Sequence, residues 1–295
     1  MRKINIYIVL IIIVLILSLT GCSNNTNMEN GEQLKSKVKA ELSFLDEELI
    51  DVMNRLNNIS FSNYIVDSKE VPSSSENSNS SSSESSQQSG GEQSQGNDQG
   101  TNSNPNNIKV TEMVENPTIS ADYNNIKWNE LQTTIEIFVS SWNTIILDLY
   151  KINVNGSNIT EFSSYLDALL IAIKNQDKVS ALTNAGVLYS YIPRYFDSFE
   201  QQSASRDIIT TKLHILNAYV GATASNWDYA NSEMILAEEF FTNLMNNTEF
   251  VKTREYNTNK TYVALKELQN SVKTQDFAIF LIKYKNVMQE IGILD

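Results

Sequence analysis

The chain has 295 residues, with 22 Lys and Arg against 35 Asp and Glu, which gives a formal net charge of −13 at pH 7. An acidic chain is repelled by nucleic-acid phosphates and by anionic lipid surfaces, so we expect no nucleic-acid partner and no electrostatic adsorption to a membrane. Cys22 is the single cysteine, which excludes an intramolecular disulfide. The stability of the fold must then come from packing.

The amino-terminal stretch Met1–Cys22 has the three parts of an export signal. Arg2 and Lys3 give it a positive start, Ile4–Leu17 is almost wholly aliphatic, and Leu19–Cys22 closes it with the sequence LTGC. A positive end, an apolar run and a small-residue site in this order are typical of a secretory signal peptide. The apolar run is shorter than the roughly 20 residues of a membrane-spanning helix.

The LTGC tetrad is similar to the lipobox of bacterial lipoproteins. This resemblance implies that residues 1–21 are removed as a signal peptide and that Cys22 becomes a diacylglyceryl-modified first residue. The implied partner is membrane lipid, and the implied location is the extracytoplasmic face of the cell membrane. Two acyl chains anchor a protein stably, whereas one holds it only marginally. An uncleaved membrane helix and a buried, inert cysteine are the alternatives.

Residues 22–32 are mostly polar and are expected to form a lipidated tether, and residues 33–62 a first long helix. Apolar residues in this second segment recur at spacings of three and four, which draws one stripe along a helix. The stripe consists of Leu34, Val38, Leu42, Leu45, Leu49, Val52, Leu56 and Ile59. An acidic run that includes Asp46 and Asp51 is expected on the solvated outer face of this helix.

Residues 72–107 contain only Ser, Asn, Gln, Gly, Thr, Pro and acidic residues, with no aliphatic or aromatic side chain. Such a segment cannot bury enough apolar surface to offset the entropy of ordering, so we expect a long disordered insertion.

A second apolar stripe follows the insertion and opens a helical domain expected over residues 122–295. It consists of Trp128, Leu131, Ile135, Phe138, Trp142, Ile145, Leu149 and Ile152. The two stripes are of similar length, so we expect the two helices to pack as an antiparallel pair with the insertion as an oversized loop. The alternative is that each packs separately on the carboxyl-terminal helices.

Three helical hairpins are predicted in the rest of the chain, because pairs of apolar-periodic segments are separated by very short polar breaks. The segments are Ile159–Lys174 with Val179–Tyr195, Ser205–Ser225 with Tyr229–Met245, and Asn257–Lys273 with Phe277–Ile291. Asp177, Asp228 and Asp276 are the expected helix N-caps, since an aspartate carboxylate accepts hydrogen bonds from free amides of the first turn. Pro193 is expected to end or kink its helix.

The predicted fold class is therefore all-α, with antiparallel helical hairpins that form a bundle or a short α-solenoid, interrupted by the disordered insertion. The spacing of the hairpins, about 50 residues, exceeds that of the common helical repeats, and no repeat signature matches. The body resembles uncharacterised helical lipoproteins of low-GC Gram-positive bacteria.

We predict no catalytic residues, no cofactor and no metal site, and hence no enzyme. The only histidine, His214, lacks a ligand partner at helical spacing, so a packing or surface role is expected for it. The chain has no Gly-rich phosphate loop and no Gly-x-Ser-x-Gly nucleophile motif. Its carboxylates are abundant, but nothing in the sequence selects a pair of them.

One cluster of aromatic residues is a candidate interaction surface, since Tyr and Arg are common at protein interfaces. It consists of Tyr189, Tyr191, Arg194, Tyr195 and Phe199 around Pro193, with Trp227 as a separate candidate at a turn. The alternative is that these rings pack a kinked helix against its neighbours.

The leading functional hypothesis is a membrane-anchored lipoprotein whose helical domain serves as a binding or scaffolding module for another envelope protein. The alternative hypothesis is a solute- or metal-binding lipoprotein with a pocket between helical hairpins.

Overall fold

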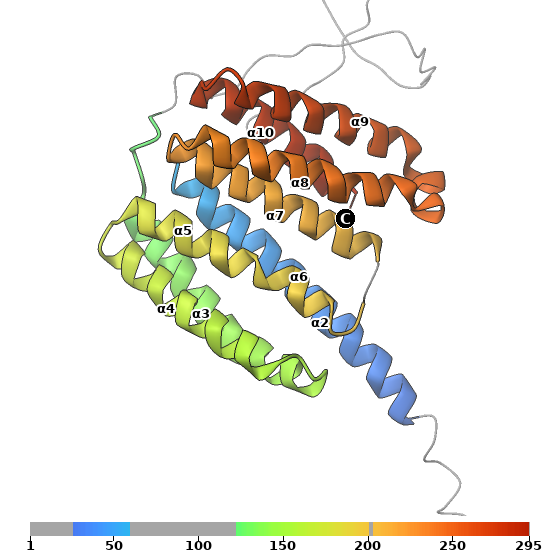
Figure 1. Cartoon of the computed structure of the whole chain (residues 1–295). Helices are drawn as coiled ribbons and strands as arrows, with labels where there is room; N and C mark the ends of the chain where they lie inside the picture. Colours follow the sequence, from blue (N-terminus) through green and yellow to red (C-terminus); the bar gives the residue numbers. More distant parts are fainter. Residues whose placement is uncertain (1–25, 60–121, 201–202, 295) are drawn as a thin grey trace, which may run out of the picture. The chain divides into compact units, whose positions relative to one another are not determined.

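The computed structural model describes residues 26–59, 122–200 and 203–294. The expected signal peptide at residues 1–21, Cys22 and the expected disordered insertion at residues 72–107 lie outside the described residues. The secondary structure of the described part is helical, which confirms the all-α class (Figure 1). Its helices are α2 (Thr26–Arg55), α3 (Trp128–Lys151), α4 (Gly156–Lys174), α5 (Lys178–Tyr189), α6 (Tyr191–Phe196), α7 (Ala204–Thr223), α8 (Trp227–Asn246), α9 (Thr248–Val272) and α10 (Phe277–Gly292).

Helix α2 begins earlier than the apolar stripe predicts. It starts at Thr26 instead of residue 33 and ends at Arg55. The helix therefore extends into the segment that was expected to be a tether. The stripe begins at Leu34, and the helical residues before it, TNMENGEQ, include one apolar side chain, so no periodic pattern marks the start of the helix.

Helices α2 and α3 form the expected antiparallel pair. Near the start of α2, Lys37 forms an ion pair with Asp148, which lies near the end of α3. Just after the end of α2, the side chain of Asn58 donates a hydrogen bond of 3.1 Å to the backbone oxygen of Asp122, which precedes α3. The earlier part of α2 therefore lies beside the end of α3, and the end of α2 lies beside the start of α3. This confirms the antiparallel arrangement.

Helix α2 also packs against helices other than α3, so the two predicted alternatives both hold in part. It contacts α5 and α6, and its side chains Asp46 and Asn54 form buried hydrogen bonds with Lys212 of α7 and Tyr284 of α10. In a solenoid each hairpin contacts only its sequence neighbours. Because helices from both ends of the chain meet on α2, the arrangement is a bundle built around the first helix.

The predicted apolar stripe of α2 forms the centre of the hydrophobic core. Six of its members are at most 1% exposed: Val38, Leu42, Leu45, Leu49, Val52 and Leu56. Burying a side chain of this size contributes about 1.5–3 kcal/mol relative to leaving it in water. Most of the stability of such a helix comes from this packing, which explains why α2 needs the rest of the chain.

The three predicted hairpins are present as α4–α5, α7–α8 and α9–α10, and their turns share one feature of backbone conformation. In each turn a residue with positive φ directly precedes the N-cap of the second helix. The pairs are Gln176 and Asp177, Ser225 and Asn226, and Gln275 and Asp276. The left-handed residue reverses the chain, and the cap side chain then accepts a hydrogen bond from an amide of the first turn.

The expected caps at Asp177 and Asp276 are confirmed, whereas the expected cap at Asp228 is wrong. The N-cap of α8 is Asn226, whose side chain accepts a hydrogen bond of 3.2 Å from the backbone nitrogen of Tyr229. Asp228 lies inside the first turn of α8. The cap position is fixed by the left-handed residue Ser225 just before it, and the break in the apolar pattern does not show where that residue lies.

Two helix boundaries differ from those that the apolar periodicity predicts. The segment expected as one helix over Val179–Tyr195 is divided at Ser190 into α5 and α6, and Pro193 lies inside α6. A proline is tolerated in the first turn of a helix, where amides have no intrahelical acceptor. Helix α9 begins at Thr248 and is kinked at Arg254, where φ is −134°.

Candidate functional site

The tyrosines predicted as an interaction surface lie in the core. Tyr189 and Tyr195 are fully buried, Tyr191 is 3% exposed, and only Arg194 in this cluster is exposed. The tyrosine rings therefore do not form an exposed surface. They pack α5 and α6 against their neighbours, as the alternative interpretation predicts. Tyr189 ends α5 and Tyr191 begins α6, so the break at Ser190 places these rings on two separate short helices.

Each buried ring has a defined partner. The ring of Tyr195 lies 6.2 Å from that of Trp142 in α3 and 5.9 Å from that of Phe162 in α4, between centroids. The hydroxyl of Tyr191 donates a hydrogen bond of 2.8 Å to Glu161. Burial, followed by this carboxylate, raises the pKa of Tyr191 to about 12. The guanidinium of Arg194 lies 4.6 Å from the centroid of the Tyr191 ring.

Phe199 and Trp227 are partly buried against the same core and do not form a surface with the tyrosines. Phe199 stacks on Phe196, with 5.5 Å between ring centroids. Trp227 makes an edge contact with Phe280 of α10, at 6.1 Å. Both rings therefore pack against the edge of the core.

His214 has the packing role that its isolation in the sequence indicates. Its Nδ1 lies 2.7 Å from Oε2 of Glu233, and its ring stacks on Phe240 at 5.3 Å between centroids. Asn217 donates a second hydrogen bond to the same carboxylate oxygen. These contacts link α7 to α8. Within the described ranges no group of three or more His, Cys, Asp or Glu side chains is arranged to hold a metal ion.

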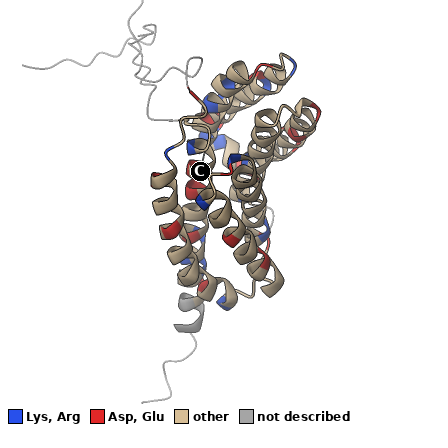
Figure 2. Cartoon of the chain, turned by 90° about the vertical axis from the view of Figure 1, so that its left-hand side faces the viewer, with Lys and Arg blue, Asp and Glu red and all other residues tan. Residues whose placement is uncertain are grey.

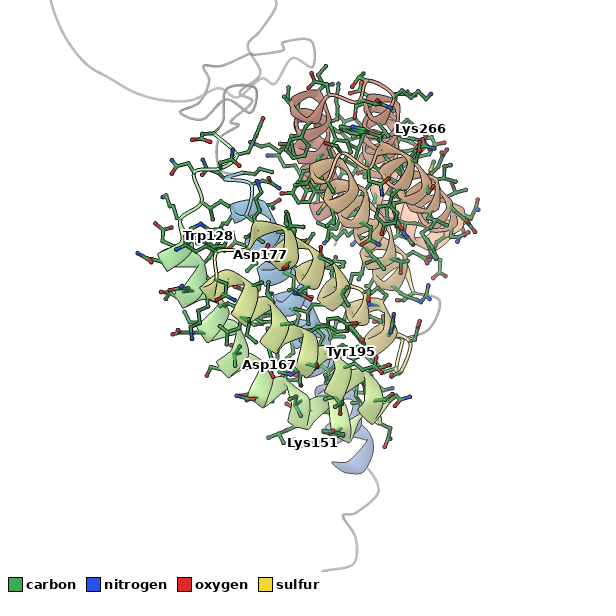
Figure 3. The ribbon with its side chains drawn as sticks, turned by 60° about the vertical axis from the view of Figure 1, so that its left-hand side comes forward. Trp128, Lys151, Asp167, Asp177, Tyr195 and Lys266 are labelled. Atoms are coloured by element: carbon green, nitrogen blue, oxygen red, sulfur yellow. The ribbon has the colours of Figure 1, made fainter. Side chains whose placement is uncertain are left out.

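A cluster of charges joins the first part of α2 to the end of α3. The Asp148 carboxylate accepts hydrogen bonds from Lys151, at 2.6 Å, and from Lys37, which also lies 3.4 Å from Glu41. The two lysines lower the pKa of Asp148, with the bond from Lys151 as the largest cause. Burial, followed by the charge of Asp148, raises the pKa of Glu41. Lys151 and Trp128 mark the two ends of α3 (Figure 3).

A pocket of about 360 Å³ lies between α9 and α10 and is the candidate functional site. Four of its residues recur at spacings of four, three and four along one face of α9, and two come from one face of α10. They are Tyr256, Lys260, Val263 and Glu267 of α9 and Asn286 and Glu290 of α10. The volume of the pocket falls within the roughly 300–1,000 Å³ of small-molecule pockets, and it is an open groove rather than an enclosed cavity.

The charges of the pocket are arranged in ion pairs between the two helices. Nζ of Lys260 lies 2.7 Å from Oε1 of Glu290. Nζ of Lys283 lies 2.5 Å from Oε2 of Glu267. The second carboxylate oxygen of Glu290, Oε2, is buried and accepts no hydrogen bond from the described part of the chain. Glu290 therefore carries one buried acceptor that no described group satisfies, on a side chain that is 10% exposed.

Acidic and basic residues are interspersed along the helices drawn in Figure 2. None of the helices in the described ranges is both long enough and apolar enough to span a bilayer.

Comparisons with known proteins give no relative from which a site could be transferred. No protein-family model matches the chain. No curated protein sequence and no solved structure matches it either.

Proposed function

We propose that the protein is a membrane-anchored extracytoplasmic lipoprotein whose helical body binds another component of the cell envelope. The lipobox-like tetrad that ends at Cys22 supports the anchor. A second acyl chain on the same cysteine makes such an anchor stable. The formal charge of −13 keeps the body from adsorbing to anionic lipid, so its surfaces stay available to a partner.

The position of α2 is the observation that carries this proposal. The helix begins at Thr26, only four positions after Cys22, and continues into the core of the bundle. Four residues reach at most about 14 Å at full extension. A lipid on Cys22 would thus hold the folded body close to the membrane, where a partner embedded in or resting on the same membrane is within reach.

Exposed aliphatic side chains on α3 and α4 support a partner on that side of the bundle. Ile137 and Leu147 of α3 and Ile171 of α4 are each more than half exposed. Single exposed aliphatic residues are common on protein surfaces, whereas a group on neighbouring helices is more typical of an interaction site. Helices α3 and α4 pack against each other, so these residues belong to one pair of helices.

Site-specific photo-crosslinking in the native envelope tests this proposal. A photoreactive residue is placed at Ile137, Leu147 or Ile171, and at exposed Glu239 of α8 as the matched control. We expect one discrete adduct of the same mass from the α3 and α4 positions and none from the control. Adducts equally strong at Glu239, or none at any position, would contradict the binding-module proposal. A Cys22→Ala variant should lose both the adduct and the membrane fraction.

A second candidate function is the capture of a small solute, and the pocket between α9 and α10 favours it. A solute that binds the folded state raises the melting temperature by mass action. A thermal-shift screen with small organic solutes therefore tests this function. A variant with Val263→Arg, which places a long side chain at the pocket, is the control that separates binding in the pocket from other effects.

A further inference from the structure

Helix α3 carries a second regular stripe of residues, on the side that faces solvent. The helix packs against α2 and α4 at one edge of the bundle (Figure 1). The members of this outer stripe are all exposed and recur at spacings of four and three, as the facing positions of a coiled coil do. They are Thr133, Ile137, Ser140, Thr144, Leu147 and Lys151. The buried face of α3 holds the helix on the bundle, so the outer stripe is available to another molecule.

The centre of the outer stripe is uncharged and has an aliphatic side chain at each end. Ile137 is 58% exposed and Leu147 is 61% exposed. No Asp, Glu, Lys or Arg occurs between Glu136 and Asp148, although charged residues make up 19% of the chain. Depletion of charged residues at its centre distinguishes a protein interface from ordinary solvated surface. The centre of the outer stripe is therefore suited to contact with another protein surface.

The residues of the outer stripe are arranged symmetrically about Trp142. Ile137 and Leu147 lie at equal distances from it along the chain, and so do the small residues Ser140 and Thr144. Across a two-fold axis every contact occurs twice, residue i with residue j and j with i.

A second copy of α3, antiparallel to the first and with the two-fold axis at Trp142, satisfies this condition. Each Ile137 then meets Leu147 of the other copy. Ser140 and Thr144 lie near the axis, where small side chains allow the two helices to approach closely. An unrelated partner would not require a symmetric arrangement of this kind.

The charges near the ends of the outer stripe favour the same antiparallel arrangement. Glu136 is exposed, and the side chain of Lys151 is 62% exposed. In the antiparallel pair, Glu136 of one copy and Lys151 of the other are displaced by only about 4.5 Å along the helix axes, which two long side chains can bridge. In a parallel pair each charge would lie at the height of its own equivalent. Opposite charges across an interface fix the register and disfavour the wrong arrangement.

We propose that the outer stripe binds a second copy of this chain in an antiparallel pair of α3 helices. The proposal rests on the proposed function and identifies the partner on the α3 side of the bundle. The stripe is about 27 Å long, and one helix pair of this length buries less than the roughly 800 Å² per partner of a standard interface. The pair is therefore weak between free molecules, and a lipid on Cys22 strengthens it by confining both copies to one membrane.

Disulfide formation in vesicles of neutral lipid tests the arrangement. The mature full-length protein is used, because acylation of Cys22 leaves an introduced cysteine as the single thiol; the protein without one is the blank. Ile137→Cys and Leu147→Cys are reconstituted together and separately. Mild oxidation joins two cysteines only where their Cα atoms come within about 7 Å. We expect at least about fivefold more dimer from the mixture, because two copies of residue 137 lie about 15 Å apart along the helix axes.

Glu239→Cys on α8 is the matched control, since Glu239 is exposed on a helix that does not contribute to the outer stripe. It should give no more dimer than the blank, alone or mixed with either α3 variant. The two α3 substitutions are at exposed positions and spare the core. Circular dichroism checks that all three variants are folded.

Exchange of two charges tests whether a second copy provides the contact. Glu136→Lys, added to both cysteine variants, places a like charge near Lys151 of the other copy and should lower the dimer yield at least about threefold. A further Lys151→Glu restores opposite charges and should recover the yield, while Asp148 keeps Lys37 as its partner. A merely structural effect of these substitutions would deepen the loss. Glu239→Lys is the control and should leave the yield unchanged.

Equal yields from the mixture and from the single variants, or a dimer formed mainly by Ile137→Cys alone, would overturn the antiparallel pair. Either result leaves the proposed function standing, because the photo-crosslinking in the native envelope decides on it separately. In that experiment an adduct with the mass of two chains supports the second copy. An adduct of any other mass overturns the second copy and supports the binding module with a different partner.

Discussion

Lys212 of α7 donates a hydrogen bond of 2.8 Å to Asp46 of α2, and both side chains are buried. Asp46 also accepts a hydrogen bond from the hydroxyl of Tyr189 in α5. One carboxylate thus connects three helices inside the core. Removing two charges from water is expensive, and the hydrogen bonds of the pair offset that cost only while both partners are present.

Lys212→Met should therefore destabilise the fold strongly. It leaves the Asp46 carboxylate buried without its cation, which costs about 3–5 kcal/mol in the free energy of unfolding. Urea denaturation monitored by circular dichroism measures the loss. Lys35→Met is the control, because Lys35 pairs with Glu32 at an exposed position and should contribute at most about 0.5 kcal/mol. Equal losses in the two variants would contradict a role of the buried pair.

The turn between α7 and α8 provides a second test, because its cap is an asparagine. Asn226→Ala should lower the free energy of unfolding by about 1 kcal/mol through loss of the bond to the Tyr229 amide. Asp228→Ala should cost only about 0.3–0.5 kcal/mol, since Asp228 acts only through the helix dipole. Chemical denaturation of both variants compares the two positions. A larger loss for Asp228→Ala would place the cap there instead.

Close contact between α7 and α8 makes Gly221 sensitive to any added side chain. A Cβ at this position would lie 2.8 Å from Cδ1 of Tyr229 and 3.2 Å from the backbone nitrogen of Ala230. Gly221→Ala should lower the free energy of unfolding by about 1–2 kcal/mol, although alanine favours a helix.

Gly186→Ala is the matched control for Gly221→Ala. A Cβ on Gly186 would lie 3.5 Å from Cγ2 of Val220, which is an ordinary contact. Because the helix gains an alanine without a clash, the variant should be more stable by about 0.5–1 kcal/mol. The melting temperatures of the two variants should shift in opposite directions, and shifts in the same direction would contradict the close packing of α7 on α8.

The charged cluster at the end of α3 predicts a pH dependence with a definite sign. The lysines hold the pKa of Asp148 below 3.8, so its contribution to stability is present above pH 3.8 and is lost as the pH falls through the folded-state pKa. Asp148→Asn should therefore lower the melting temperature at neutral pH and flatten its fall below about pH 4.

Glu41→Gln should act in a different pH window. The pKa of Glu41 is raised above 4.5, so the folded state binds a proton before the unfolded chain does, and stability rises as the pH falls toward 4.5. Glu41→Gln should remove this rise and leave the behaviour below about pH 4 unchanged. Melting curves between acidic and neutral pH measure both effects. The same change in slope for both variants would contradict the two assignments.

The helices could be predicted from the sequence because their apolar residues recur at helical spacing. The stripes of α2 and α3, their antiparallel pairing and the three hairpins follow from this periodicity and from the shortness of the breaks. The ends of the helices could not be predicted with the same accuracy. The start of α2 at Thr26 and the N-cap at Asn226 depend on backbone angles in polar segments, and polar residues carry no periodic signal there.

The polar interior could not be predicted from the same pattern. Asp46 belongs to an acidic run that was expected in solvent, yet it is buried because Lys212 from a distant helix pairs with it. The residues Lys260 and Glu267 of the pocket look like an ordinary solvated helix face. Their spacing of seven residues puts them on one side of α9, but only the fold shows that Glu290 lies opposite.

Mass spectrometry of the native protein, purified from its membrane fraction, tests the central claim most directly. We expect a first residue Cys22 that carries a thioether-linked diacylglyceryl group, with no peptide from residues 1–21. An intact leader, or a free thiol on Cys22, would contradict the anchor and with it the proposed function.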